Sequence, residues 1–194
     1  MSAPVMLAAH HKHVATMIHE QNSIVGVSNK MVAKYMDAIV ICYEKCFEEF
    51  GREKTRLLGN PRASNAVHAV FDRDYFLSLG LTLNKPLILV VMGSLGSTSV
   101  NAIMKDALPA VRDTYQILFV TGKNNYEEMR KQIHAPHVKV VDYVKQLDIM
   151  AQVDLIVCRA GATTAAEITA LGTPSILVPS PYVAHNHQFY NASV

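Results

Sequence analysis

Five short apolar runs, rich in β-branched residues, recur through the second half of this chain with helix-like segments between them. They span residues 87–92, 116–120, 138–141, 155–158 and 175–178. Their hydrophobicity is continuous rather than alternating, which is typical of strands covered on both faces. This repeat predicts an α/β fold with a doubly wound parallel sheet, helices on both sides and right-handed crossovers.

The first 60 residues predict only part of a second Rossmann-like domain. We expect strands at 16–18 and 38–42, a helix at 25–35 between them, and a third short strand at 56–58; no strand signal precedes Thr16. Strand residues 39–41 are therefore expected to lack their usual partners and to be poorly covered. Breaks at Asn60-Pro61 and Asn84-Lys85-Pro86 place a partial N-terminal domain at 1–60, a linker at 61–85 and a C-terminal domain at 86–194.

Composition excludes several function classes. Half of the 194 residues are hydrophobic and 18% are charged, so the chain reads as a globular protein with a sizeable core. A formal charge of +2 without any basic run argues against nucleic-acid binding. The longest apolar run is far shorter than the roughly 20 residues of a membrane helix, and no secretory leader opens the chain, so the cytoplasm is the expected compartment.

Neither the cysteines nor the histidines predict a metal site. The three cysteines, an odd number without metal-ligand spacing, are expected to be reduced. Two histidine pairs, His11-x-His13 and His185-x-His187, have no cysteine or acidic ligand at a recognisable spacing. We therefore expect no metal and no cofactor.

The stretch 158–167 indicates an anion site. A buried strand at 154–157 leads into a turn of small residues, which opens a helix. Free backbone N–H groups and the helix dipole favour a phosphate there, and Gly161 with Ala162 allows close approach. Glu167 would lie about one turn into the helix, within reach of a ribose diol. The alternative is a capping box, in which Thr164 and Glu167 satisfy the helix's own amides.

Further motifs follow one another in a recognisable order. They are His19-Glu20-Gln21-Asn22, Gly26, Asn29-Lys30, Gly59-Asn60-Pro61-Arg62, Gly93-Ser94-x-Gly96 with Asn101, Arg159-Ala160-Gly161-Ala162-Thr163-Thr164-x-x-Glu167, Pro179-Ser180-Pro181-Tyr182, Asn186-His187-Gln188 and Asn191-Ala192. In this order the chain resembles the MurG family along its whole length. These bacterial peptidoglycan glycosyltransferases move N-acetylglucosamine from UDP to the undecaprenyl-linked muramoyl-pentapeptide, converting lipid I to lipid II. The resemblance implies a GT-B fold with a UDP-sugar-binding C-terminal domain.

The resemblance also implies a set of donor-binding residues. They are Asn22, Arg62, Ser94, Val144, Ala162, Thr163, Thr164, Glu167, His187 and Gln188. The backbone amides of Ala162, Thr163 and Thr164 would hold the diphosphate, and Glu167 the ribose. Ser94 would contact a phosphate, the Val144 backbone would meet uracil beside Tyr143, and Gln188 with His187 would read the sugar hydroxyls.

Asn22 would face the donor across the cleft, and Arg62 would contact it. For several of these positions the residues alone leave a structural alternative open: a helix cap for Ser94, a helix cap before residues 23–26 for Asn22, and ordinary packing for Tyr143.

The implied chemistry needs positioning and charge stabilisation, which helix N-termini can supply to the departing UDP without a metal. The implied partners are UDP-N-acetylglucosamine, the lipid I acceptor and the cytoplasmic face of the bacterial membrane, where the protein would be peripheral.

The family's N-terminal glycine-rich loop and its histidine base have no counterpart here, so the base would lie upstream of residue 1 and the chain is expected to be inactive alone. The alternatives are a non-catalytic UDP-sugar-binding module and a UDP-sugar epimerase of the same architecture.

Overall fold

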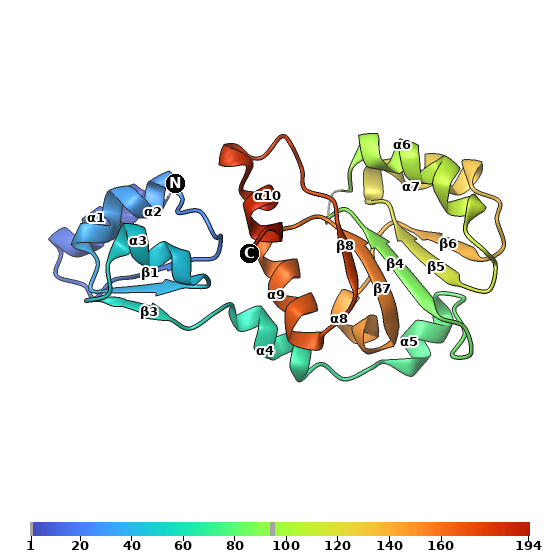
Figure 1. The fold of residues 1–194 in the computed structure, drawn as a ribbon, viewed down its shortest axis with the longest axis horizontal. Helices are drawn as coiled ribbons and strands as arrows, with labels where there is room; N and C mark the ends of the chain where they lie inside the picture. The colour runs from blue at the N-terminus through green and yellow to red at the C-terminus, as the bar shows by residue number, and fades with distance from the viewer. Residues whose placement is uncertain (1, 94–95) are drawn as a thin grey trace. The chain divides into compact units, whose positions relative to one another are not determined.

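The computed structural model describes residues 2–93 and 96–194, which form two compact units with one parallel sheet each (Figure 1). The first unit comprises the residues up to Ser64 together with Ala160–Ala166 and Pro179–Val194. The second comprises Asn65–Arg159 and Glu167–Val178.

The first unit is built on a three-stranded parallel sheet in the order β1-β2-β3. Its strands are β1 (Met17–Glu20), β2 (Ala38–Ile41) and β3 (Thr55–Leu57), with Met17 opposite Ala38 and Ile39 opposite Thr55. The helices are α1 (Ser2–His11), α2 (Val27–Val32), η1 (Ala33–Tyr35), η2 (Glu44–Cys46), α3 (Phe47–Phe50), the start of α4 (Pro61–Val67), the start of α9 (Ala162–Leu171), η5 (Ala184–Asn186) and α10 (His187–Ala192). The three predicted strands are confirmed, and the helix predicted at 25–35 is present as α2 followed by η1.

Strand β2 is better covered than the sequence predicts. It lies between β1 and β3, and Ile39 and Ile41 are fully buried in the core of this unit. The expectation of an exposed, unpartnered strand is therefore wrong. Part of the cover comes from the unpredicted helix α1, whose Met6 and Leu7 pack against that core. Burying these side chains offsets the cost of ordering the helix.

A carboxylate fixes the start of β1. Asp37 accepts two hydrogen bonds from Thr16 through Oδ2, one from the backbone N at 2.7 Å and one from Oγ1 at 2.8 Å. These bonds favour the ionised form, and the hydrogen bonds from Thr16 lower the pKa of Asp37 below its ordinary value. The turn that leads into β2 is thereby tied to the residue that precedes β1.

The second unit contains a five-stranded parallel sheet in the order β6-β5-β4-β7-β8. The strands are β4 (Leu87–Val91), β5 (Gln116–Val120), β6 (Val138–Val141), β7 (Val153–Cys158) and β8 (Ser175–Leu177). Its helices are the end of α4, α5 (Arg73–Ser78), α6 (Thr98–Ala107), η3 (Leu108–Ala110), α7 (Lys123–Gln132), α8 (Gln146–Ile149), η4 (Met150–Gln152) and the remainder of α9. All five predicted strands are confirmed, two of them with the predicted bounds.

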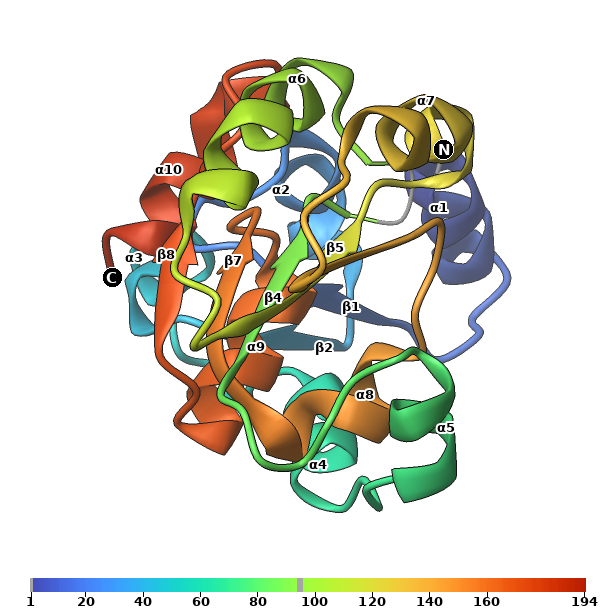
Figure 2. The same ribbon diagram turned by 90° about the vertical axis from the view of Figure 1, so that its right-hand side faces the viewer.

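Helices cover both faces of this sheet, as the continuous hydrophobicity of the strands requires. Helices α6 and α7 lie on one face, over a cluster that includes Val90 and Phe119 (Figures 1 and 2). The other face packs against α5, α8 and α9 through Phe76, Ile149 and Ile168. The result is a three-layered α/β/α unit.

The topology of the sheet marks where a ligand would bind. From β4 the chain winds outward through β5 and β6, and then returns to the other side of β4 to form β7 and β8. The neighbours β4 and β7 therefore flank a topological switch point, outside whose carboxyl ends ligands bind in open α/β sheets.

The segment 61–85, expected to be a linker, contains α4 and α5. Asn60 does not break the chain there; its Oδ1 accepts a hydrogen bond from the backbone N of Arg62 at 3.0 Å and caps α4, with Pro61 in the first turn. The division at residues 60 and 86 stays a prediction. No helix within the described parts of the chain combines the length and apolarity needed to cross a membrane.

Candidate functional site

The loop after β4 is pressed tightly against the end of β5. Gly96 has a φ of +71°, and a Cβ at this position would lie 1.9 Å from the carbonyl oxygen of Thr121. Only glycine fits there. The same carbonyl accepts a hydrogen bond from the buried Asn101 amide at 2.9 Å. These contacts hold the described part of the loop against the end of β5, whereas Ser94 lies outside the described residues.

A cation follows β7 directly. Arg159 donates a hydrogen bond to the carbonyl of Val178 at 3.0 Å and to Oγ of Ser97 at 2.9 Å. The guanidinium therefore joins the ends of β7 and β8 to the loop after β4. It also places a permanent positive charge at the carboxyl edge of the second sheet.

Helix α9 begins at Ala162, where Gly161 accepts the first helical hydrogen bond from Ala165 N at 2.9 Å. Thr164 is therefore inside the first turn and not at the N-cap, so the capping-box alternative is wrong. Ala162 and Thr164 are half-buried and Thr163 is exposed. The first turn of this ten-residue helix is thus partly exposed, and the helix dipole favours an anion at this end.

Glu167 lies on the same helix, three and four residues after Thr164 and Thr163, so the three residues share a face. It is 3% exposed, and its Oε2 accepts a hydrogen bond from Nε2 of Gln146 at 3.3 Å. Gln146 opens α8, two residues after the buried Val144. The second unit therefore brings together the predicted ribose and uracil residues, with Gln146 as a link that sequence reasoning missed.

Two side chains near the Gln146–Glu167 hydrogen bond, those of Cys158 and Tyr143, differ in their exposure to solvent. Burial, together with the smaller effect of the negative charge of Glu167, raises the pKa of the Cys158 thiol to about 12. The ring of Tyr143 is 59% exposed, next to Val144. An exposed ring contributes little to a core, so the structure gives ordinary packing of Tyr143 little support.

In the first unit, the loop after β1 is organised by a buried carboxylate. Glu20 is 2% exposed and accepts four hydrogen bonds. Oε1 accepts from the backbone N of Asn22 at 3.0 Å and from Nδ2 of Asn22 at 3.4 Å. Oε2 accepts from Gly26 N and from Nδ2 of Asn29, both at 2.8 Å. Sequence reasoning assigned Glu20 no role, although it belongs to the motif His19-Glu20-Gln21-Asn22.

Asn22 does not cap a helix, because α2 begins at Val27 with Gly26 as its N-cap. The helix-cap alternative for Asn22 is therefore wrong. Asn22 instead lines a cavity of about 330 Å³ together with Glu20, Asn29, His185 and His187; the remaining lining residues are Ile24, Val25, Gly26, Val27 and Ser28. The structure thus brings Asn22 and His187, both predicted donor residues, to one cavity in the first unit.

The segment before α10 has an unusual backbone. His185 and Asn186 adopt φ values of +54° and +51°, the left-handed region that few non-glycine residues occupy. Gln188, in the first turn of α10, accepts a hydrogen bond at Oε1 from the backbone N of Ser180 at 2.8 Å. This bond fixes the position of the predicted sugar-reading side chain against its own loop.

Two further residues of the sequence motifs, His19 and Asn60, form hydrogen bonds around the turn that precedes α4. The Nε2 atom of His19 lies 3.1 Å from the carbonyl oxygen of Gly59, which can only accept, so this nitrogen carries the hydrogen. Arg62 is the second residue of α4, and Asn60, which caps that helix, also donates to Oε1 of Gln21 at 3.4 Å. The loop after β1 and the start of α4 are therefore joined in the first unit.

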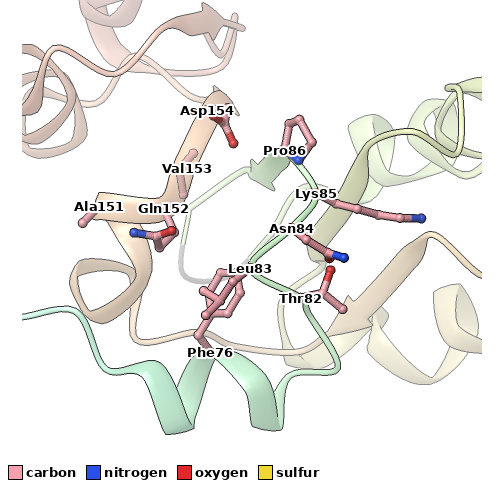
Figure 3. Close-up of a pocket in the computed structure, with 10 residues that line it drawn as sticks. All are labelled: Phe76, Thr82, Leu83, Asn84, Lys85, Pro86, Ala151, Gln152, Val153 and Asp154. Carbon is pink, nitrogen blue, oxygen red and sulfur yellow. The ribbon is translucent and has the colours of Figure 1, made fainter.

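A second cavity of about 330 Å³ lies at the opposite, amino edge of the second sheet (Figure 3). Its two charged side chains form hydrogen bonds within the fold: Oδ2 of Asp154 accepts from Leu87 N at 2.8 Å, and Lys85 donates to the carbonyl of Asp113 at 3.0 Å. The side chain of Lys85 points away from the hollow in Figure 3. The start of α9, the Arg159 cation and the close contact at Gly96, all described above, lie at the carboxyl edge and not at this amino edge. In the described residues no three His, Cys, Asp or Glu side chains form a metal-binding group.

Comparison with known proteins bears on these findings. Residues 87–194 match the glycosyltransferase family 28 C-terminal domain, and residues 1–41 match the glycosyltransferase family 28 N-terminal domain. The first of these matches alone covers more than half of the chain.

Curated relatives carry one name, UDP-N-acetylglucosamine--N-acetylmuramyl-(pentapeptide) pyrophosphoryl-undecaprenol N-acetylglucosamine transferase. The protein of Limosilactobacillus reuteri is 43% identical over 201 residues, which cover 99% of this chain and 54% of the relative. That of Halalkalibacterium halodurans is 43% identical over 98% of this chain and 54% of the relative. The chain therefore spans about half the length of these relatives, and the resemblance found in the sequence motifs is confirmed.

Solved structures support the fold. MurG of Acinetobacter baumannii superimposes with a TM-score of 0.75 at 23% identity, over 99% of this chain and 53% of that one. A putative UDP-N-acetylglucosamine 2-epimerase of Listeria monocytogenes gives a TM-score of 0.72 at 12% identity, over 99% of this chain and 57% of that one. At these identities the likeness bears on fold alone. The predicted α/β fold of GT-B type with Rossmann-like domains is confirmed.

Proposed function

Because this chain belongs to glycosyltransferase family 28, we propose that it forms the donor-binding part of a UDP-N-acetylglucosamine-dependent hexosyltransferase. The proposed reaction transfers N-acetylglucosamine to undecaprenyl-pyrophosphoryl-N-acetylmuramoyl-pentapeptide, converting lipid I to lipid II in peptidoglycan synthesis. The names of relatives at 43% identity support this assignment.

The observation that carries the proposal is the geometry of α9. Its accessible first turn follows β7 at the switch point, and Glu167 lies on the same face one turn later. We assign the first-turn amides of Ala162, Thr163 and Thr164 to the diphosphate. As the sugar departs, negative charge develops on the β-phosphate, and fixed N–H dipoles stabilise that charge without reorganising.

The remaining predicted residues receive the rest of the donor. We assign Glu167 to the ribose hydroxyls, the Val144 backbone to uracil, and Ser94 and Arg62 to the phosphates. In the first unit we assign Asn22, His187 and Gln188 to the sugar. The shared cavity of Asn22 and His187 supports that assignment, since convergent polar groups in a concave site are typical of ligand pockets.

The acceptor determines where the reaction takes place. A lipid-linked acceptor, as the names of the relatives describe, stays in the bilayer, so we place the protein peripherally at the cytoplasmic face of the bacterial membrane.

Titration calorimetry of the chain with UDP and UDP-N-acetylglucosamine tests the donor site. We expect both ligands to bind; absence of any binding would contradict the proposal.

A chimera tests the transfer reaction. The matching half of the Limosilactobacillus reuteri relative is replaced by this chain, and radiolabelled N-acetylglucosamine transfer to a lipid I analogue is measured. We expect the chimera to transfer sugar and an otherwise identical Glu167→Gln chimera to transfer much less. A chimera that binds UDP and does not transfer sugar would favour the alternative function, a non-catalytic UDP-sugar-binding module.

A further inference from the structure

The last helical turn of the chain carries a buried amide that the proposed donor site does not use. Asn191 is 4% exposed and lies on α10, four residues after His187 and three after Gln188. This spacing places the three residues on one side of the helix. A buried amide requires hydrogen-bond partners, and the identity of those partners determines what Asn191 does.

The partners of Asn191 come from two segments far away in the sequence. Its Oδ1 accepts from the backbone N of Ser23 at 2.9 Å and from Oγ of Ser23 at 3.1 Å. Its Nδ2 donates to Oδ1 of Asn22 at 3.1 Å and to the carbonyl oxygen of Ala160 at 3.2 Å. Two acceptor positions and two N–H donors are thus all occupied, which completes the hydrogen-bonding capacity of the amide.

These bonds determine the orientation of Asn22. Its Nδ2 donates to the carboxylate of Glu20, and its Oδ1 accepts from Asn191. Rotation of the Asn22 amide by 180° would place two acceptors against each other on one side and two N–H groups against each other on the other. Only one of the two orientations is therefore compatible with both neighbours.

Ala160, the third partner, is fully buried and precedes Gly161 at the turn that opens α9. The Ala160 carbonyl is thus held by the same side chain that holds Asn22. Because all of these residues belong to the first unit, one amide joins the loop after β1, the turn before α9 and helix α10.

We propose that Asn191 is a positioning residue of the donor site, which sets the Asn22 amide and the turn before α9 in one shared arrangement. This proposal rests on the proposed function, because Asn22 and the first turn of α9 are the groups assigned there to the sugar and the diphosphate. Asn191 itself contacts neither the donor nor the acceptor in this assignment.

Variants at three positions separate positioning from general stability. Asn191→Ala removes all four bonds, whereas Asn191→Asp keeps an acceptor for Ser23 and removes the donors to Asn22 and Ala160. Ser23→Ala removes one bond to Asn191 and leaves Asn22 untouched. Ser193→Ala is the control at the C-cap of the same helix, because its Oγ donates to Phe189 O at 2.8 Å and contacts neither Asn22 nor Ala160 through a hydrogen bond among the described residues.

The first measurement needs no ligand. Nitrogen-15 NMR of the full 194-residue chain follows the Asn22 side-chain NH₂ signal, assigned by its loss in Asn22→Ala. In Asn191→Asp and Asn191→Ala we expect this signal to shift and its hydrogen exchange to accelerate about tenfold or more, with both unchanged in Ser193→Ala. An unmoved Asn22 signal in both Asn191 variants, with the fold retained by circular dichroism, would overturn the proposal.

The second measurement is calorimetric binding of UDP-N-acetylglucosamine to Asn22→Ala, Asn191→Ala and the double variant. Asn191→Ala should weaken binding about five- to tenfold, and the double variant should lose less than the product of the two single losses, because Asn191 acts through Asn22. Losses that multiply would show independent roles and overturn the proposal. A chain that binds neither UDP nor UDP-N-acetylglucosamine counts against the proposed function, whereas the NMR result still decides whether Asn191 positions Asn22.

Discussion

The side-chain amide of Gln146 donates a hydrogen bond to the carboxylate of Glu167, and this bond joins the loop after β6 to helix α9. Glu167 is nearly fully buried, so its side-chain oxygens need hydrogen-bond donors that replace water. Gln146 is one such donor. If the two ribose hydroxyls are further donors to this carboxylate, the same group binds the nucleotide and accepts the hydrogen bond from Gln146.

Glu167→Gln tests that role of the carboxylate. A carboxylate that accepts from two hydroxyls forms charge-assisted bonds worth roughly 1.5–3 kcal/mol each, so we expect UDP binding to weaken about tenfold or more. Calorimetric titration measures the loss, and thermal unfolding without ligand shows how much of it is instability. 2′-Deoxy-UDP should bind the unmutated chain more weakly and lose much less on mutation. If the loss of affinity caused by Glu167→Gln and the loss caused by removing the 2′-hydroxyl multiply, Glu167 and the ribose do not contact each other.

Gln146→Ala tests the link itself. Removing a hydrogen-bond donor from a buried carboxylate leaves it less well held, so we expect UDP binding to weaken about three- to tenfold. Gln152→Ala is the matched control, since Gln152 is exposed and lines the cavity at the opposite edge of the same sheet. Equal effects of the two substitutions on UDP binding would refute a specific role for Gln146.

Three glycine-to-alanine substitutions separate clash from backbone strain. Gly161→Ala meets no described atom within 4 Å and needs no positive φ, so stability should change by less than about 1 kcal/mol. Gly172→Ala has the same space but a φ of +65°, and should cost about 1–2 kcal/mol. Gly96→Ala combines a φ of +71° with a contact at 1.9 Å and should cost more than about 3 kcal/mol. Denaturant unfolding measures the series, and any other order contradicts the geometry.

The buried thiols predict a loss of stability at alkaline pH. Burial raises the pKa of Cys158 to about 12 and of Cys46 to about 11, whereas an unfolded cysteine titrates near 9. Between pH 9 and 12 the unfolded chain therefore loses protons that the native chain keeps, and the free energy of unfolding falls as pH rises. Cys158→Ala should give a shallower fall over this range than the unmutated chain in denaturant unfolding. Identical slopes would show that Cys158 titrates normally.

Asp37 predicts the opposite dependence at acidic pH. Its pKa is lowered by the hydrogen bonds from Thr16, so its contribution is present above the ordinary pKa of about 3.8 and is lost as pH falls through the lower native value. We expect the stability difference between the unmutated chain and Asp37→Asn to shrink as pH falls from 5 to 2. Asp74→Asn, an exposed aspartate of the second unit, is the control. Hydrogen exchange of β1 amides follows the change, and a constant difference would rule out the effect.

Strands β4 and β5 of the second unit were predictable because they are buried on both faces, which leaves an uninterrupted apolar run in the sequence. Helix α1 was not. Its partly buried residues Ala3, Met6 and Leu7 stand in a sequence with no charged face to set them apart, so no period is visible. Asn60-Pro61 was interpreted as a break, although an N-cap followed by proline also begins a helix, as it does in α4.

The residues that we propose for the donor site were predictable to different degrees. Residues of α9 were found from the local pattern of strand, small-residue turn and helix, which needs no distant partner. Glu20 and Asn191 were assigned no role because their importance comes from what they contact, and Ser23 and Asn191 are 168 positions apart in the sequence. A single buried polar residue gives no periodic signal, and its partners become known only when the chain is folded.

The left-handed residues His185 and Asn186 mark a place where this chain is less stable than its fold allows. Asparagine tolerates this conformation, but histidine does so at a cost of roughly 1–2 kcal/mol that glycine would avoid. Residues held in this conformation cluster at sites where a particular side chain is needed. The ring of His185 lines the cavity shared by Asn22 and His187. Replacing His185 by glycine would therefore relieve backbone strain and at the same time remove a side chain from the lining of this cavity.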